Sequence, residues 1–571
     1  MATLRIALAQ SGARVGDVRT NSVTLLDAWR TAAEAGADLV VTPELALVGY
    51  PPDDLLLRPT LHHRVDAALL EMARSGPAGT AALIGTIGLS ARDGSDGWGV
   101  ASAVPDLANR AALLDGGRIA GTYDKMRLPN EGVFDEARYF VPGDRTLVVE
   151  VGGVRVGTVI CQDLWTAGGP VARTVADGAQ VVAVLNASPY HRGKRTEREE
   201  WVTHHARELG VFVCYVNRVG GQDEVVFDGD SMVADPSGRI VARGMQFVPD
   251  LVVVDLDVTS GTGAPVDAGH GPDLGLEATE ELWQALVVAT RDYCRGNGFR
   301  EAVVGLSGGI DSAVTAAIAV DALGPEAVLG VAMPSPYSSD HSVDDAYALA
   351  RLLGTRIEQL PIGPALAAVS TTLEGLVVTG YDGEVPAGVA YENLQSRLRG
   401  LLLMALSNER GAIVLTTGNK SEYAVGYATL YGDMSGGFAP LKDVLKGEVY
   451  ALARHANRDG ERIPDSTITK PPSAELRPGQ VDADSLPDYD RLDAMLVGLV
   501  EELRDVDELV AAGHDRDEVL RVMRLVDRAE HKRRQAAPGP KVSRRAFGRE
   551  RRVPITSGFD ASEASDDGSP R

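Results

Sequence analysis

Cysteine is scarce in this chain, and the cysteines that occur are widely separated. Cys161, Cys214 and Cys294 are odd in number and far apart in a chain of 571 residues, which argues against a disulfide framework and against a clustered metal site. Long apolar runs are also missing, and none reaches the length needed to cross a bilayer. The N-terminus lacks the pattern of an export signal, so we expect a cytoplasmic enzyme without a membrane partner.

Positive charge is in deficit over most of the chain. The net charge of -24 disfavours non-specific binding to the phosphate backbone, so we expect no nucleic-acid partner. One basic strip, 524–552, departs from this balance, with eleven Lys or Arg against three Asp or Glu. The strip can be interpreted as a solvated basic face or as an RNA-binding surface, but we favour a surface that meets polyanionic nucleotides.

The length and the patterning indicate two large domains of the α/β class. Short apolar runs such as LRIALAQ alternate with helical patterns up to about residue 258, which predicts a layered α/β domain. After a Gly-, Pro- and Asp-rich stretch, strands alternate with helices in the order typical of a doubly wound parallel sheet, whose ligands bind at the carboxyl ends of its strands. The predicted boundaries are 1–258 for the first domain, 259–276 for a linker, 277–556 for the second domain and 557–571 for a disordered tail. In the second domain we expect helices at about 311–323, 342–353, 391–408, 443–457, 489–503 and 516–534.

The octapeptide GLSGGIDS, residues 305–312, joins an apolar strand to a helix. Glycines let the backbone approach a ligand closely, and the free N–H groups of a helix start attract anions, so the natural guest is a phosphate or pyrophosphate. The common mononucleotide loop has a lysine before its Ser or Thr, whereas Ile310 and Asp311 stand here, which argues against a GTPase or an ATPase motor. Asp311 beside a polyphosphate suggests bound Mg²⁺. A turn that merely caps a helix is the structural alternative.

Three polar residues of the first domain each follow an apolar run. Glu44 lies in LVVTPELAL, Lys125 in GTYDKMRLPN and Cys161 in VGTVICQDLW. A thiol must lose its proton to attack an acyl group, a glutamate can accept that proton, and a lysine can stabilise the oxyanion that forms. Each residue alone is more simply explained as a core cysteine or a solvated charge. Together they satisfy the needs of thiol acyl transfer, and the sequence around them favours that interpretation.

The words around these residues resemble two known groups of enzymes. TPEL, YDK.RLPN and ICQD resemble the nitrilase superfamily, whose amidases use a Glu–Lys–Cys triad in this chain order. That resemblance implies an α-β-β-α sandwich with Glu44 as general base, Lys125 as oxyanion stabiliser and Cys161 as nucleophile. GLSGGIDS resembles the loop of the adenine-nucleotide alpha-hydrolases, the ATP pyrophosphatases, which implies a Rossmann-like doubly wound sheet and cleavage of ATP between its α and β phosphates.

A further segment of the first domain resembles the part of the nitrilase-type glutaminases that holds the amino-acid end of glutamine. In NASPYHRGKRTEREE, Ser188 and Lys194 fall on the matching positions, although the basic residues at 192–195 could also form only an exposed turn. Glu131 stands where some relatives have tyrosine. This departure leaves open whether Glu131 binds the amino group of the substrate or assists proton transfer.

The combination of both halves resembles the glutamine-dependent NAD synthetase family over nearly the whole chain. YENLQSRLRG and TTGNKSEYAVGYATLYGDMSGGFAPLKDV follow its pattern. The resemblance implies a homo-oligomer that converts glutamine, deamido-NAD and ATP into glutamate, NAD, AMP and pyrophosphate with Mg²⁺ as cofactor, in the last step of NAD biosynthesis. It assigns ATP to Gly305, Leu306, Ser307, Gly308, Gly309, Ile310, Asp311, Ser312 and Thr417, deamido-NAD to Asn393, Glu422 and Lys532, and Mg²⁺ to Asp311 and Glu422.

Other functions stay open on the residues alone. A different ATP-dependent amide synthetase would share both halves but act on another acid. A tRNA-modifying protein would use the basic strip to grip RNA, and a non-catalytic nucleotide sensor would release no pyrophosphate.

Overall fold

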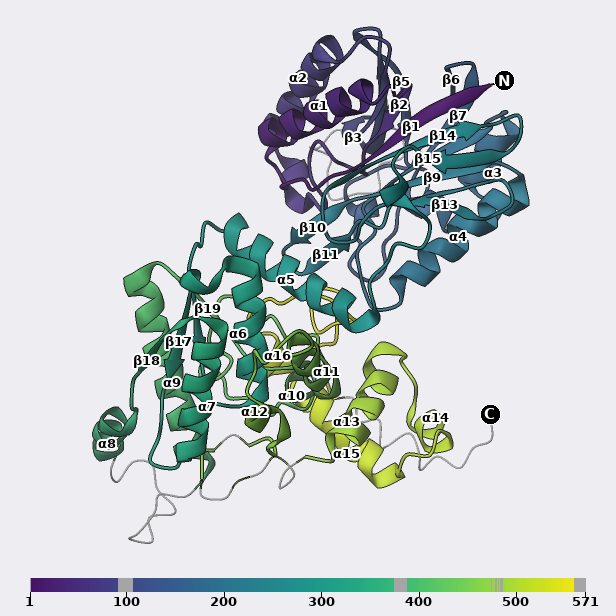
Figure 1. Cartoon of the computed structure of the whole chain (residues 1–571). Helices are drawn as coiled ribbons and strands as arrows, with labels where there is room; N and C mark the ends of the chain where they lie inside the picture. The colour runs from purple at the N-terminus through teal and green to yellow at the C-terminus, as the bar shows by residue number, and fades with distance from the viewer. Residues whose placement is uncertain are drawn as a thin grey trace. The chain divides into compact units, whose positions relative to one another are not determined.

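The computed structural model of the chain describes residues 2–90, 106–373 and 388–558, apart from 474, 478, 479, 481 and 483–485. The chain folds into two compact units, Met1–Glu277 and Ala278–Arg571. Figure 1 draws the elements of both. The predicted disordered tail, 557–571, lies outside the described residues from 559 onward.

Two stacked β-sheets form the centre of the first unit, and helices cover their outer faces. The first sheet has the strand order β15 (Thr262–Pro265), β14 (Asp250–Asp257), β1 (Thr3–Gln10), β2 (Leu39–Val41), β3 (Ala81–Leu89), β4 (Leu107–Asp115) and β5 (Arg118–Asp124). The second has the order β13 (Ile240–Arg243), β12 (Met232–Ala234), β9 (Phe212–Asn217), β8 (Val181–Asn186), β7 (Val154–Ile160) and β6 (Leu147–Val151). In Figure 1 the first sheet is flanked by α1 (Val18–Glu34) and α2 (Pro59–Ser75), and the second by α3 (Pro170–Ala176) and α4 (Lys194–Leu209). The predicted α-β-β-α sandwich is confirmed.

The apolar pattern of β1 shows why this strand lies between two layers. Successive side chains of a strand point to opposite faces of its sheet. Ile6 and Leu8 pack in a core cluster that also contains residues of the second sheet. Ala7 and Ala9 pack on the other face, in a cluster that contains Trp29 of α1. The sheet is therefore buried on both faces at β1, as the nearly continuous apolar sequence of this strand requires.

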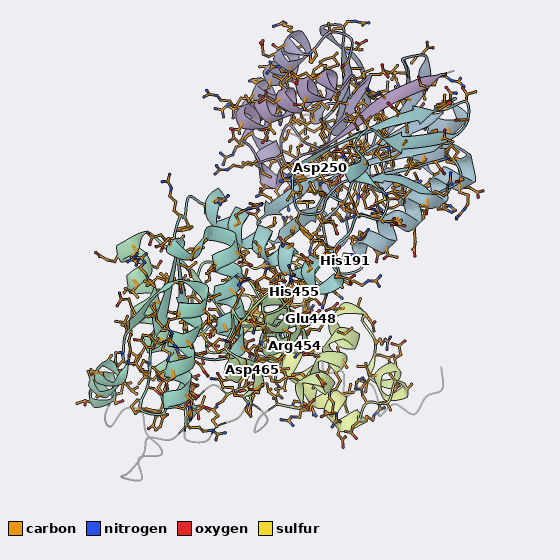
Figure 2. All side chains as sticks on the ribbon, viewed as in Figure 1. His191, Asp250, Glu448, Arg454, His455 and Asp465 are labelled. Atoms are coloured by element: carbon orange, nitrogen blue, oxygen red, sulfur yellow. The ribbon has the colours of Figure 1, made fainter. Side chains whose placement is uncertain are left out.

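The segment 259–276, which the sequence predicts to be a linker, lies in the first unit. Part of it forms β15, which pairs antiparallel with β14 at the edge of the first sheet. Farther along, the His270 ring lies 3.0 Å from the carboxylate of Asp250, which is labelled in Figure 2. A strand pairing and a side-chain contact thus fasten this segment to the first sheet.

A parallel sheet forms the centre of the second unit, with the strand order β18 (Arg356–Gln359), β17 (Val328–Ala332), β16 (Ala302–Gly305) and β19 (Ile413–Leu415). The chain runs from β16 to β17 and β18 and then crosses back to β19 on the other side of β16. The point where strand order reverses is where ligands bind in doubly wound sheets, and the GLSGGIDS loop follows the strand at this point. The predicted fold class of this unit is confirmed.

Helices cover both faces of the parallel sheet. On one face, buried residues of the strands pack with Leu402, Leu403 and Leu406 of α9 (Val389–Arg410). On the other, α6 (Ile310–Leu323) packs on β16 and β17 and carries α5 (Ala278–Gly296) and α11 (Lys446–Ala456) on its outer side. The remaining helices of this part are α7 (Asp340–Leu353), α8 (Gly363–Thr372), α10 (Lys420–Val425) and α12 (Asp465–Thr469).

A small helical cluster lies near the C-terminal end of the second unit. It contains α13 (Tyr489–Leu496), α14 (Val506–Ala511), α15 (Arg516–Arg528) and α16 (Glu530–Arg533). The helix predicted at 516–534 is interrupted at Ala529, and the one predicted at 489–503 ends as a π-helical turn, Val497–Glu501. No described helix is both long and apolar enough to cross a membrane.

Two candidate active sites

The three candidate catalytic residues of the first unit converge from three different strands. Glu44 follows β2, Lys125 comes directly after β5, and Cys161 comes directly after β7. All three side chains are buried, and the Lys125 Nζ atom donates a hydrogen bond to Glu44 Oε1 over 2.6 Å. Cys161 lies close enough that the charges of both residues act on its thiol. The structure therefore brings the predicted triad together.

Burial and charge set the protonation of these groups at rest. Burial is the main reason why the pKa of Cys161 lies well above its ordinary value; the charge of Glu44 raises it further, and the Lys125 ammonium opposes the rise. Burial alone would lower the pKa of Lys125, but the charges of Glu136 and Glu44 outweigh it and raise that pKa. The resting site thus holds a neutral thiol beside an ammonium, and the thiol needs a base before it can attack.

A second buried carboxylate, Glu136, was not predicted from the sequence. Its Oε1 atom accepts hydrogen bonds from Lys125 Nζ and from the Tyr50 hydroxyl, each over 2.8 Å. Burial raises the pKa of Glu136 to about 7, against the opposing charge of Lys125. Asn109 of β4 donates to Glu44 Oε1 over 2.7 Å. Neither residue carries a local sequence signal, because Asn109 on β4 and Glu136 in the short 3-10 helix Glu136–Arg138 reach the site only through tertiary packing.

The predicted glutamine-binding residues differ in burial and in their hydrogen-bond partners. The backbone N–H of Ser188 donates to Asn217, and the buried Arg198 guanidinium donates to the Ser188 hydroxyl over 3.3 Å. The Lys194 ammonium lies 3.0 Å from a Glu197 carboxylate oxygen and 3.8 Å from the centre of the Trp165 ring. Burial lowers the pKa of Lys194.

Glu131, by contrast, is exposed. Its backbone carbonyl accepts a hydrogen bond from the N–H of Phe134. A role for the Glu131 side chain stays a prediction.

In the second unit the GLSGGIDS loop folds as a tight turn between β16 and α6. Gly308 has a φ of +76°, and a Cβ atom at this position would lie 2.3 Å from the carbonyl oxygen of Ser342 in the first turn of α7. Ser307 Oγ accepts from the Gly309 N–H over 3.2 Å, and Ser312 Oγ donates to the Gly309 carbonyl over 2.8 Å. The loop is therefore packed against helix backbone, which explains why glycine is required there.

A cavity of ≈ 660 Å³ opens at this loop. Every residue that the sequence assigns to ATP or deamido-NAD lines it, except Gly308, which faces α7. The lining residues are Gly305, Leu306, Ser307, Gly309, Ile310, Asp311, Ser312, Asn393, Thr417, Glu422 and Lys532. Residues predicted from separate stretches of sequence thus surround one cavity.

Asp311 and Glu422 converge on a buried lysine that was not predicted. Lys446 Nζ lies 2.5 Å from Asp311 Oδ2 and 3.3 Å from Glu422 Oε1. Burial raises the pKa of Glu422 to about 8, against the charge of Lys446. Asn419, the N-cap of α10, donates to the other oxygen of Asp311 over 2.9 Å. The two carboxylates therefore share one counter-charge at the wall of the cavity.

Comparison with known proteins identifies both units. The carbon-nitrogen hydrolase family matches residues 5–264, and the NAD synthase family matches residues 282–536. The chain is 48% identical to the glutamine-dependent NAD(+) synthetase of Xanthomonas campestris over 98% of both chains. It is 45% identical to the enzyme of that name from Synechocystis, over 97% of this chain and 99% of the relative. The chain belongs to the glutamine-dependent NAD(+) synthetase family.

A solved member of the family has the same fold. The glutamine-dependent NAD+ synthetase of Acinetobacter baumannii, determined in complex with adenosine diphosphate, is 40% identical and superposes with a TM-score of 0.76, covering 98% of this chain and 99% of that one. The enzyme of that name from Cytophaga hutchinsonii is 22% identical with a TM-score of 0.81, which supports the fold.

Within this family member part of the basic strip, 524–552, is paired internally. Arg533, Arg534 and Arg551 all donate to the carboxylate of Glu530. Lys532 points to the cavity, where its ammonium donates to the backbone carbonyls of Gly426 and Ala428 over 2.9 and 2.8 Å. Burial lowers the pKa of Lys532. The three arginines on Glu530 therefore help to hold the chain end in place.

One more cationic side chain at the cavity was not predicted. Arg399 of α9 lines it, and its Nε atom donates to the Met333 carbonyl over 3.1 Å. Burial lowers the pKa of Arg399. It lies in the sequence YENLQSRLRG, but nothing in that stretch distinguishes Arg399 from the exposed Arg397, so only the fold could single it out.

Proposed function

We propose that this chain hydrolyses glutamine in its first unit and uses the ammonia in its second unit to convert deamido-NAD into NAD, with ATP cleaved to AMP and pyrophosphate. This is the last step of NAD biosynthesis. The observation that carries the proposal is the convergence of Glu44, Lys125 and Cys161 at one buried point. Membership of the glutamine-dependent NAD(+) synthetase family supports the pairing of the two reactions.

In the first unit Glu44 acts as the general base. Because burial keeps the Cys161 thiol protonated, Glu44 takes its proton as the sulfur attacks the carboxamide carbon of glutamine. The Lys125 ammonium stabilises the oxyanion that forms. Collapse of the intermediate breaks the C–N bond, the proton held by Glu44 leaves with ammonia, and water activated by Glu44 then hydrolyses the thioester to glutamate.

Ser188 and Lys194 hold the amino-acid end of glutamine. Lys194 is a partly buried ammonium whose present carboxylate partner, Glu197, is a side chain of the same helix. The α-carboxylate of glutamine competes for that ammonium and forms a charge-assisted hydrogen bond with it. Glu131 serves either the amino group of the substrate or the proton transfers.

In the second unit the GLSGGIDS loop and Thr417 bind ATP, and Asn393, Glu422 and Lys532 bind deamido-NAD. The N–H groups at the start of α6 attract the phosphates of ATP, and the Lys532 ammonium at the cavity wall attracts a dinucleotide phosphate. The nicotinate carboxylate attacks the α phosphate and pyrophosphate leaves. Ammonia then attacks the carbonyl carbon of the adenylate and AMP leaves, giving NAD.

Asp311 and Glu422 suit Mg²⁺. Both present hard carboxylate oxygens at the wall of the cavity, on either side of Lys446. Among the described residues no group of three or more His, Cys, Asp or Glu is placed to hold a metal alone, and Mg²⁺ at phosphate sites takes one or two carboxylates plus phosphate oxygens and water. When bound, Mg²⁺ would neutralise charge on the leaving pyrophosphate.

Labelled nitrogen tests the proposal directly. With glutamine carrying ¹⁵N in its amide, the label is expected in the carboxamide of NAD, as read by mass spectrometry. Cys161→Ala should abolish this synthesis and leave synthesis from added ammonium unchanged. Equal loss of both activities would contradict the division of labour between the units.

A homo-oligomer in the cytoplasm, with no nucleic-acid or membrane partner, completes the proposal. Its support is the family resemblance and the negative charge of the chain. Sedimentation equilibrium measures the subunit number, and a single-chain mass would refute the oligomer.

A further inference from the structure

The segment that carries Lys125 is tied to one buried carboxylate, Asp163. The Tyr123 hydroxyl donates to Asp163 Oδ2 over 2.7 Å. The backbone N–H groups of Met126 and Arg127 donate to Oδ1 over 3.1 and 2.8 Å. Donors on both sides of Lys125 along the chain therefore meet one side chain, which fixes the backbone from which the ammonium projects.

The same carboxylate holds the turn that carries Cys161. Asp163 Oδ2 accepts from the N–H of Ile160 over 3.1 Å, and so closes the turn around the nucleophile. Cys161 has a φ of +43°, in the left-handed region that a residue with a side chain rarely adopts. Such a conformation costs about 1–3 kcal/mol and persists only where the surroundings hold it.

We propose that Asp163 is a positioning residue for amide cleavage: its carboxylate fixes the Lys125 segment and the strained Cys161 turn in one arrangement, so that ammonium and thiol act on the same carbonyl group. The proposal rests on the glutaminase activity proposed above. Asp163 is not predicted to touch the substrate.

Only a carboxylate suits this position. Asp163 meets four donors and needs to accept from all of them, which two carboxylate oxygens can do. In an asparagine, an NH₂ group, which cannot accept a hydrogen bond, replaces one of the two oxygens. Whichever way the amide is oriented, this NH₂ group would face two of the four donors. Burial raises the pKa of Asp163 to about 6, so a buried charge is retained here at a cost.

The experiment compares Asp163→Asn with wild type in the full-length chain. A displacement near 1 Å can cost about 100-fold in rate, so kcat for glutamine hydrolysis should fall about 100-fold, whereas KM for glutamine should stay within about threefold because Ser188 and Lys194 are untouched. Synthesis of NAD from ammonium should not change.

Alkylation of Cys161 supplies a readout that lost stability alone would move in the opposite direction, because opening of the fold relieves the burial that raises the pKa of this thiol. Burial raises the pKa of this thiol, and the Lys125 charge opposes part of that rise. When Lys125 is displaced, the rate of iodoacetamide labelling at Cys161, followed by peptide mass spectrometry, should therefore rise only at higher pH than in wild type.

Asp235→Asn is the matched control. Asp235 is also fully buried in the first unit and accepts backbone and side-chain hydrogen bonds from Ser237 and Arg239, in the turn between β12 and β13. The Asp235→Asn variant should have a lower melting temperature than wild type but the same kcat for glutamine hydrolysis and the same pH profile of Cys161 alkylation. If Asp163→Asn does not fold, Tyr123→Phe removes one donor, keeps the carboxylate, and should shift both readouts less in the same direction.

Kinetics equal to those of Asp235→Asn, or equal losses with glutamine and ammonium, would overturn the role of Asp163 alone. A wild-type chain that fails to hydrolyse glutamine, or a Cys161→Ala variant that still does, would instead overturn the proposed function.

Discussion

Replacement of Gly308 by Ala should disable the second unit through a steric clash. The added Cβ would lie 2.3 Å from the carbonyl oxygen of Ser342, and ordinary contacts begin near 3.4 Å. Helix backbone cannot yield, so the loop has to move by at least about 1 Å, and a displacement of this size at a reacting centre costs about 100-fold in rate. We therefore expect kcat/KM for ATP to fall about 100-fold, which corresponds to about 2.7 kcal/mol.

Gly411→Ala separates the clash from backbone strain. Gly411 ends α9 with a φ of +63°, and nothing lies within 4 Å of an added Cβ. Both variants carry the left-handed strain of about 1–2 kcal/mol, but only Gly308→Ala has the clash. The assay is NAD formation from deamido-NAD, ATP and ammonium, so that the first unit does not enter. If Gly308→Ala keeps kcat/KM within about threefold of Gly411→Ala, the packing argument is wrong.

The remaining predictions concern charge. Lys125→Met leaves Glu44 and Glu136 buried without their counter-ion, so it should destabilise the first unit by about 3–5 kcal/mol in urea unfolding and abolish glutamine hydrolysis. Glu136→Gln should flatten the pH dependence of the free energy of unfolding. Burial raises the pKa of Glu136 from 4.5 to about 7, so the folded chain holds this proton more tightly than the unfolded chain does. The stabilisation that results from the bound proton is complete below pH 4.5 and is lost as pH rises through about 7. Melting curves of both proteins between these pH values measure the difference, and parallel slopes would exclude the effect. Asp311→Asn should greatly reduce NAD synthesis both from glutamine and from ammonium. Retained synthesis from ammonium would contradict the assignment of Asp311 as a Mg²⁺ ligand.

The sequence predicted those parts of the fold that local pattern encodes. The apolar run before GLSGGIDS became β16, and the helix expected from 311 begins at Ile310. Glu44, Lys125 and Cys161 were found because each lies just beyond the end of a strand, and the ends of strands are where such side chains can meet. The resemblance of the short motifs around these residues to those of known families then connected positions that are far apart in the chain.

Residues that reach a site through tertiary packing could not be predicted in this way. Glu136, Asn109 and Lys446 lie in stretches with no distinguishing spacing, and their partners come from other elements. Strand β15 was missed for a related reason. Its sequence, TGAP, has no apolar alternation and forms a strand only because the edge of β14 offers it hydrogen bonds.

That short edge strand decides where the chain can be divided for engineering. A truncated protein that ends at residue 258 would lack β15, so the edge of β14 would be unpaired and prone to aggregation. It would also lack the His270 ring that contacts Asp250. A truncated protein that ends at Glu277 keeps β15 as a short edge strand, and the proline at its end disfavours pairing with a further strand. Anyone grafting this nitrogen-releasing half onto another synthetase should therefore carry the extra residues along.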